Sequence, residues 1–310
     1  MQSLTIGTRG SRLALIQTDQ VRAALLAHYP ELEVLTTIIT TKGDVNLNIP
    51  LVGIKDKGLF ITEIEEALRC GQVDLAVHSA KDLPGQLAPD LQIAAYLVRA
   101  DARDVLVSLY GSLAALPSRA RIGTGSPRRA AQLRALRPDL AILDIRGNVD
   151  TRLRKLEGGA YDALVLAAAG LHRLGLEQVV SEYLDPDIML PAVGQGALAV
   201  EIRATDHSLA ALLAPLDHLP TAQAVNAERS FLARMNAGCS AVVGAYATVE
   251  QDVLTISAMV GGADGRILRA MRQGVVADGG RLAEELAETL LRQGAGLLLV
   301  GASGGASDGE

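Results

Sequence analysis

The segment Leu4-Thr5-Ile6-Gly7-Thr8-Arg9-Gly10-Ser11 passes from a short apolar strand pattern to the start of a helix. Ser11 is a typical N-cap residue, and the apolar positions that follow it keep helical spacing until Pro30. The β-branched run at residues 34–41 then predicts a second strand. This order of elements indicates a β-α-β unit and hence an α/β domain.

A buried strand follows further along the chain and ends in polar residues. A helix pattern at residues 60–69 precedes the strand Asp74-Leu75-Ala76-Val77-His78-Ser79, which continues into Ala80-Lys81-Asp82-Leu83-Pro84. Open α/β sheets place their ligands at the carboxyl ends of strands, so we expect a ligand here. The Gly- and Pro-containing stretch 46–58 is typical of a mobile loop beside such a site.

The strand-and-helix order recurs later in the chain. Arg121-Ile122-Gly123 predicts a strand end, Ser126 a helix cap, and Asn148 a second cap. Strands are expected at 197–202, returning to the first domain, and at 242–249, 253–260 and 267–273, before a last helix at 281–292. The predicted organisation is an α/β domain at 1–98 with 198–215, another at 102–192, an α+β domain at 218–300, and a disordered tail at 301–310.

Composition excludes several classes of function. Lys and Arg number 29 against 35 Asp and Glu, for a net charge of −6, so any attraction to polyanions must be local. Aromatic residues are 3% with no Trp, which argues against stacking on nucleic acid. No apolar stretch approaches the ~20 residues of a membrane span and no export signal is recognised, so we expect a cytoplasmic protein. Cys70 and Cys239 lack the spacing of a disulfide framework or zinc site, and no metal is expected.

Arginines are placed where predicted strands pass into helices. They occur in Thr8-Arg9-Gly10-Ser11, in Thr124-Gly125-Ser126-Pro127-Arg128-Arg129 and in Arg146-Gly147-Asn148-Val149-Asp150-Thr151-Arg152. Helix N-termini offer free N–H groups, and guanidinium groups bind carboxylate or phosphate in a bidentate manner. A single such arginine is usually solvated or in an ion pair. Their repetition in three turns favours a polyanionic ligand.

Common catalytic motifs are absent. Gly123-x-Gly125 has Arg128 where a dinucleotide fingerprint needs glycine, and neither a P-loop nor a Gly-x-Ser-x-Gly elbow occurs. Asp82 is then either an ionised carboxylate that stabilises a cationic intermediate or moves protons, or a cap of the turn before Pro84. Cys239 is likewise either an inert small hydrophobic residue or a nucleophile of low pKa.

Taken together, the motifs resemble the porphobilinogen deaminase family, also called hydroxymethylbilane synthases. The resemblance covers nearly the whole chain, and its motifs include His78-Ser79-x-Lys81-Asp82-Leu83-Pro84, Leu190-Pro191-Ala192-Val193-Gly194-Gln195-Gly196 and Ala227-Glu228-Arg229, besides the arginine turns above. It implies two domains like those of type II periplasmic binding proteins plus a small α+β C-terminal domain. It also implies a dipyrromethane cofactor attached to Cys239 through a thioether.

The implied reaction joins four porphobilinogen units head to tail on that cofactor, expels ammonia each time, and releases hydroxymethylbilane by hydrolysis. Asp82 matches the family's catalytic carboxylate. The positions that match cofactor contacts are Lys81, Asp82, Ser11, Thr124, Ser126, Arg128, Arg129 and Arg146. Those that match substrate contacts are Arg9, Ser11, Arg146, Arg152, Arg173, Gln195, and Lys57 and Phe60 of the loop beside the cleft.

The resemblance further implies a monomer with a small-molecule substrate and no nucleic-acid or membrane partner. The sequence departs from the family pattern where Gly53 and Lys55 are exchanged, and at Gly125, Pro127, Ala237, Val242 and Val243. We expect altered contacts of the loop and a slightly different cofactor segment. Two other functions fit the arginines: a non-enzymatic protein that binds a small anion, and a phosphate-ester enzyme, which would need paired acidic metal ligands.

Overall fold

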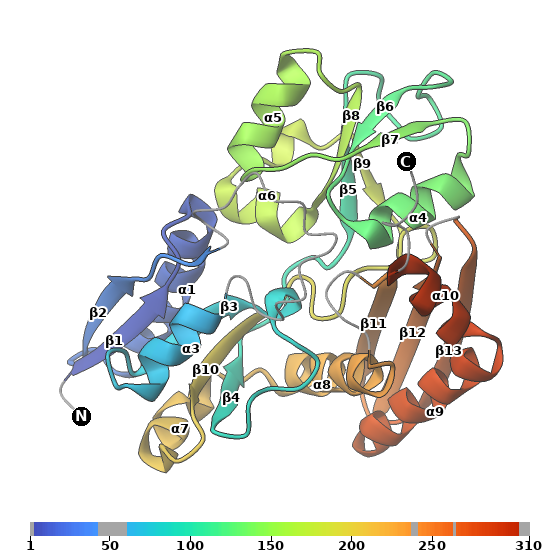
Figure 1. Cartoon of the computed structure of the whole chain (residues 1–310). Coiled ribbons are helices and arrows are strands. Elements are labelled where there is room, and N and C mark those ends of the chain that lie inside the picture. Colours follow the sequence, from blue (N-terminus) through green and yellow to red (C-terminus); the bar gives the residue numbers. More distant parts are fainter. Residues whose placement is uncertain (1–2, 43–60, 237–240, 263–264, 304–310) are drawn as a thin grey trace, which may run out of the picture.

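Three β-sheets, each with its own core, organise the chain in the computed structural model (Figure 1). The structure describes residues 3–42, 61–236, 241–262 and 265–303, with the side chains of residues 300–303 excepted. Two five-stranded α/β sheets and a three-stranded antiparallel sheet confirm the predicted fold class of two α/β domains and a small α+β domain.

The first sheet has the strand order β2-β1-β3-β10-β4. Its parallel strands are joined through α1 and α3, and α1 begins where Ser11 Oγ accepts a hydrogen bond from Ala14 N at 3.2 Å, as its sequence predicts. The elements are β1 (Ser3–Thr8), α1 (Arg12–His28), β2 (Glu33–Ile38), α3 (Thr62–Arg69), β3 (Leu75–Ser79), the 3₁₀ turn η1 (Ala80–Asp82), β4 (Leu91–Tyr96), β10 (Leu198–Arg203) and α7 (His207–Leu213). Strand β10 returns to this sheet as expected and pairs antiparallel with β3 and β4.

The second sheet repeats this pattern in the order β7-β6-β8-β5-β9. Ser126 and Asn148 cap α4 and α5, as their sequence contexts predict, whereas β4, β5 and β9 were not predicted. The elements are β5 (Asp104–Ser108), β6 (Arg121–Gly123), α4 (Pro127–Leu136), β7 (Ala141–Leu143), α5 (Val149–Glu157), β8 (Ala163–Ala167), α6 (Ala168–Leu174) and β9 (Glu182–Leu184). In both sheets the fourth strand is antiparallel to its neighbours and directly follows a connection from the other sheet.

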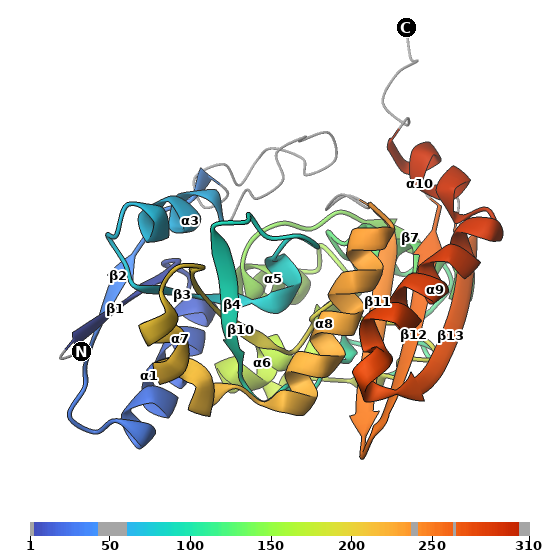
Figure 2. The ribbon, with the colours of Figure 1, turned by 90° about the horizontal axis from the view of Figure 1, so that it is seen from below.

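The third unit packs the helices α8, α9 and α10 against a three-stranded meander (Figure 2). Its elements are α8 (Leu219–Arg234), β11 (Val243–Glu250), β12 (Val253–Gly261), β13 (Ile267–Val275), α9 (Gly279–Arg292) and α10 (Ala295–Ser303). The prediction of a disordered tail from residue 301 is wrong for residues 301–303, which belong to α10. Leu298 and Leu299 pack against the core of this unit, so the apolar run holds the helix beyond the predicted boundary.

Two connections, at residues 97–103 and 185–197, link the α/β sheets, and they touch where they cross. Ala100 N donates to Gly196 O at 3.2 Å, and a Cβ on Gly196 would lie 2.5 Å from Ala100 O. A Cβ on Gly194 would lie 2.9 Å from the Ala80 Cβ and 3.2 Å from Lys81 N. Both glycines have positive φ, so only glycine allows these close contacts without strain. The second connection therefore supports η1 directly.

A buried carboxylate joins these connections to the third unit. Glu228 of α8 is fully buried and pairs with Arg99 of the first connection at 2.6 Å. It also accepts hydrogen bonds from Gly194 N at 2.6 Å and from Ala247 N of β11 at 2.8 Å. Because its oxygens have donors from three parts of the fold, Glu228 holds these parts together.

Replacing Glu228 by Gln should destabilise the protein by about 3 kcal/mol, because it leaves the largely buried Arg99 guanidinium without a counter-charge. Urea unfolding measures this change in free energy. The matched control is Glu288→Gln, which breaks the exposed pair with Arg234 at 3.5 Å and should cost no more than about 0.5 kcal/mol. An equal decrease in the free energy of unfolding in the two variants would contradict the role given to Glu228.

Candidate active site

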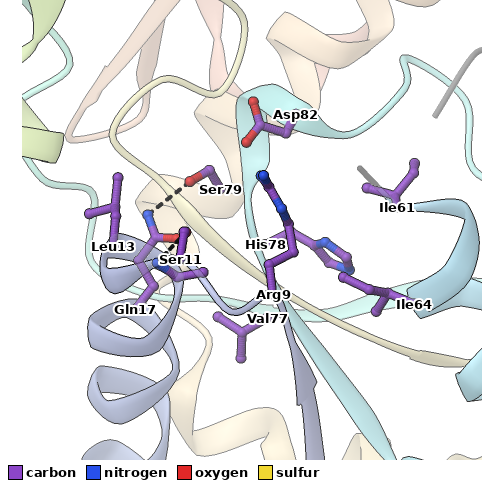
Figure 3. Close-up of a pocket in the computed structure, with 11 residues that line it drawn as sticks. Arg9, Ser11, Leu13, Gln17, Ile61, Ile64, Val77, His78, Ser79 and Asp82 are labelled. Carbon is purple, nitrogen blue, oxygen red and sulfur yellow. Dashed lines mark hydrogen bonds between the residues drawn. The ribbon is translucent and has the colours of Figure 1, made fainter. Parts of the chain in front are cut away.

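A pocket lies at the carboxyl ends of β1 and β3, beside the N-terminus of α1 (Figure 3). Arg9, Ser11, His78, Ser79 and Asp82 line it, together with Leu13, Ala14, Gln17, Ile61, Ile64 and Val77. The strand ends bring these residues together because β1 and β3 are adjacent and parallel. The structure thus brings three predicted site residues, Arg9, Ser11 and Asp82, into one pocket.

Two polar side chains of this pocket, Ser79 and His78, are held by neighbours in the first domain. Gln17 Nε2 of α1 donates to Ser79 Oγ at 2.8 Å, which fixes the start of η1 against α1. The Arg9 side chain extends toward the side of the pocket where Asp82 lies (Figure 3). His78 Nε2 contacts Glu201 Oε2 at 3.1 Å, and both side chains are buried. His78 is therefore a paired residue at a strand end.

The second domain contacts the N-terminal part of α1, which borders the pocket. Arg12 Nη1 of α1 lies 3.5 Å from Asp150 Oδ1 of α5, and a Cβ on Gly170 of α6 would contact Leu13 Cδ2 at 3.8 Å. The N-terminus of α1 therefore reaches the second domain directly.

Lys81 and Asp82 form the exposed end of η1. Surrounding protein, and next the positive charge of Arg129, lower the pKa of Lys81 to about 8, although solvent reaches the side chain. The charges of Asp82, Asp104 and Arg128 also act on Lys81. Lys81 of the first domain therefore shares one electrostatic environment with arginines of the second.

Arg128 and Arg129, at the start of α4, are buried against Asp104 of β5. Arg129 donates from Nε and Nη2 to Asp104 Oδ1 at 3.1 and 2.7 Å. Arg128 Nη2 lies 2.8 Å from Asp104 Oδ2, an ion pair without hydrogen-bond alignment. Despite its burial, the two guanidinium groups hold the pKa of Asp104 below its usual range. Both arginines thus have a protein partner before any ligand binds.

Gln195 of the second connection belongs to the same group. Its Nε2 donates to Asp104 Oδ1 at 2.8 Å and to Ala102 O at 2.7 Å, and its side chain is buried. Thr124, just before α4, is also buried, and its Oγ1 accepts a hydrogen bond from Ser126 N at 3.2 Å. Ser126 in turn caps α4 through Arg129 N. Gln195, Thr124 and Ser126, which the sequence predicts to contact ligand, thus shape the start of α4.

Arg146 and Arg152 add positive charge near Arg129. Burial lowers the pKa of Arg152 to about 10, and the charges of Arg129 and Arg146 act in the same direction. Arg146 Nε donates to Asp144 Oδ2 at 2.9 Å, and Arg152 Nε donates to Gly147 O at 2.8 Å. We call Lys81, Arg128, Arg129, Arg146 and Arg152 the cationic cluster. Such a group of like charges favours an anionic ligand.

Arg173 lies on α6, and its Nη2 donates to Gly196 O at 2.8 Å. Burial lowers its pKa to about 10. The structure therefore places this predicted substrate contact against the second connection. Lys57, Phe60 and Cys239, with Gly53, Lys55 and Ala237, lie outside the described residues.

In the described part of the chain, no group of three or more His, Cys, Asp or Glu side chains is arranged to hold a metal ion. Within the same residues, no helix is both long enough and apolar enough to cross a membrane.

Family models match both parts of the chain. A model described as the dipyromethane cofactor binding domain of porphobilinogen deaminase matches residues 4–211, and one for the C-terminal domain matches residues 222–292. The chain belongs to the porphobilinogen deaminase family. The predicted resemblance is confirmed, and the chain is assigned to an enzyme family rather than to anion-binding proteins without activity.

Curated relatives of this name span nearly the same length. The porphobilinogen deaminase of Roseiflexus castenholzii is 58% identical over 96% of this chain and 99% of its own. Those of Syntrophus aciditrophicus and Deinococcus radiodurans are 50% and 46% identical over 96% of this chain and 97% and 98% of their own. Among solved structures, the Bordetella pertussis BvgS periplasmic VFT2 domain has a TM-score of 0.42 and 14% identity, covering 74% of this chain and 92% of that chain.

Sequence reasoning about this porphobilinogen deaminase family member missed Asp104. Asp104 directly precedes the apolar run Val105-Leu106-Val107, so a polar residue at the start of a buried strand was the available signal. Its partners are distant in the sequence: Arg129 is 25 residues away and Gln195 is 91 residues away. The spacing of residues therefore could not reveal its contacts.

The titration of Lys81 tests the electrostatics of the cluster. We expect its midpoint near pH 8, measured by NMR on reductively ¹³C-methylated protein, with the Lys81→Arg variant identifying the resonance. Removing the neighbouring charge in Arg129→Met should raise the midpoint, because a like charge disfavours the protonated amine. A midpoint near the ordinary value of 10.5 in the wild type would contradict this environment.

Proposed function

We propose that this protein condenses four porphobilinogen molecules head to tail, expels one ammonia for each, and releases hydroxymethylbilane by hydrolysis. In every condensation the aminomethyl carbon of one pyrrole loses ammonia and bonds to the free α carbon of the chain's terminal pyrrole, which then loses its proton. The observation that carries the proposal is the cationic cluster, whose Lys81 directly precedes Asp82 of the pocket. Asp82 lines the pocket, its neighbour Lys81 interacts electrostatically with Arg128 and Arg129 of the second domain, and the chain belongs to a family that bears this name.

The cluster suits a ligand that carries several carboxylates. Each pyrrole unit bears an acetate and a propionate, so a growing chain adds two negative charges at every step. Arg146 and Arg152 each bind a protein oxygen through Nε, and their Nη groups carry further N–H donors. Guanidinium groups bind carboxylates in a bidentate manner. We assign substrate carboxylates to Arg9, Arg146, Arg152 and Arg173. Their number fits the polycarboxylate better than it fits a single small anion.

The same residues fit a dipyrromethane cofactor, which is itself a carboxylate-bearing pair of pyrroles. We propose that Cys239 holds it through a thioether and that Lys81, Arg128, Arg129, Thr124 and the cap residues Ser11 and Ser126 face its carboxylates. The two arginines also receive carboxylates of the substrate units that are joined to it. The N–H groups at the start of α1 and α4 add positive potential at these positions. The bound group supplies a terminal pyrrole with a free α carbon, which receives the first substrate unit.

Asp82 is the group we assign to proton movement and charge stabilisation. It is exposed at the end of η1 and lines the pocket, so a substrate can reach it. Loss of ammonia and the bond-forming step each produce positive charge on a pyrrole, and a nearby carboxylate stabilises that charge. Gly194 packs against Ala80, so η1 has little freedom to move away from the site. We further propose a cytoplasmic monomer without nucleic-acid or membrane partners, in line with the composition.

The Asp82→Asn variant tests this role. We expect turnover to fall by roughly 10²- to 10⁴-fold, the usual contribution of a positioned acid or base, while folding and the attached cofactor are retained. Porphobilinogen consumption gives the rate, and intact mass gives the cofactor. Asp139→Asn, which alters a surface ion pair with Arg137 at 2.7 Å, should keep the wild-type rate. Near-normal turnover in Asp82→Asn would remove Asp82 from the mechanism.

The attachment site has a matched pair of variants. Cys239→Ser should lack the mass of a two-pyrrole adduct and be inactive, because an alkoxide is far less accessible than a thiolate at neutral pH. Cys70→Ser should keep both the adduct and the activity, since Cys70 is exposed at the end of α3. Loss of the adduct in Cys70→Ser alone would reassign the attachment.

A further inference from the structure

Asp104 is fully buried at the start of β5 and contacts three side chains from different segments. Arg128 and Arg129 reach it from the first turn of α4, at 2.8 and 2.7 Å, and Gln195 reaches it from the second connection at 2.8 Å. A lone buried carboxylate is costly, so the two guanidinium groups and the amide together make its burial possible. The group contains one negative charge and two positive charges, which leaves a net positive charge.

The remaining contacts of the two arginines are also to protein groups. Arg129 Nη1 donates to Val165 O of β8 at 3.0 Å, and Arg128 Nη1 donates to Leu190 O. Two adjacent guanidinium groups repel each other, and without Asp104 between them the repulsion would drive them apart. Arg128 Nε is buried and has no hydrogen-bond partner among the described residues. Asp104 therefore holds two cations close together.

Asp104 also lies where the two interdomain connections meet. Gln195, which binds Asp104 through Nε2, binds Ala102 O with the same atom at 2.7 Å. The Gln195 carbonyl accepts from Arg99 Nε at 2.9 Å, and Arg99 is the partner of Glu228. A continuous chain of polar contacts thus runs from the third unit, through both connections, to the arginines of the cationic cluster.

We propose that Asp104 is a positioning residue of the reaction. It sets the spacing and direction of Arg128 and Arg129 so that they bind a pair of pyrrole carboxylates. Through Gln195 it also fixes the two arginines relative to the interdomain connections. The inference rests on the proposed function, because it takes the two arginines as carboxylate-binding groups. Asp104 sets the geometry of the two arginines without contacting the substrate itself.

The test keeps the charge and changes the geometry. Asp104→Glu preserves the buried negative charge but lengthens the side chain by one methylene, which displaces both guanidinium groups. We expect KM for porphobilinogen to rise about tenfold, which corresponds to the loss of one well-aligned charge-assisted contact, while kcat stays within about twofold. The extra buried methylene should also lower the melting temperature. The matched control is Asp162→Glu, which makes the same change in an Asp–Arg pair on the same sheet, with Arg121 at 3.0 Å. It should leave KM unchanged.

A second variant covers the case in which Asp104→Glu does not fold. Gln195→Met removes one hydrogen bond to Asp104 without changing any charge, and it should raise KM in the same direction by a smaller factor. Wild-type KM in a folded Asp104→Glu, or in Gln195→Met if the former does not fold, would overturn the proposal. So would a loss of melting temperature and kcat at constant KM, because that pattern belongs to a purely structural residue.

These outcomes are separate from a failure of the proposed function. If the wild-type protein forms no stepwise adducts with porphobilinogen by intact mass, the reaction itself is wrong, and so is the positioning role that depends on it. If the wild type forms them and Asp104→Glu matches its KM, only the role of Asp104 is wrong.

Discussion

Two fully buried carboxylates, Glu228 and Asp104, lie at the crossing of the interdomain connections, and the rest of the molecule depends on how they are compensated. Each is paired with arginine, and Gln195 joins the two groups by donating to Asp104 and accepting from Arg99. Separating the connections would leave Glu228 buried without Arg99, at a cost of several kcal/mol, and would remove the Gln195 amide from Asp104. The domains can therefore change their relative position only in ways that keep these contacts.

This constraint explains how a site can be assembled from both domains. Gly194 is held by Glu228 and packs against Ala80, so the second connection fixes η1 with Lys81 and Asp82. Asp104 fixes the start of α4 from the other domain. The two walls of the site are thus tied to one crossing point, and their distance is set by packed backbone rather than by the long side chains that meet the ligand.

Local structure was largely readable from the sequence, and non-local structure was not. Ser11, Ser126 and Asn148 cap their helices as expected because a cap involves residues three positions apart. Strands β4, β5 and β9 were missed since their register depends on partners elsewhere in the fold. The arginine turns were found, yet the acids that hold them were not, because Asp104 meets residues 25 and 91 positions away. The family resemblance supplied the ligand chemistry that geometry alone left open.

The mixture of one lysine with several arginines in the cationic cluster has a chemical consequence. Arginine stays protonated throughout the physiological range, so its contribution to the site is fixed. Lys81, whose pKa lies at about 8, shares its proton with the solvent at mildly alkaline pH. An arriving carboxylate favours the protonated form, so binding and proton uptake are linked. A chain that gains carboxylates with each unit added would hold Lys81 charged more firmly as it grows, and the site would adjust its charge to the ligand while the arginines keep its shape.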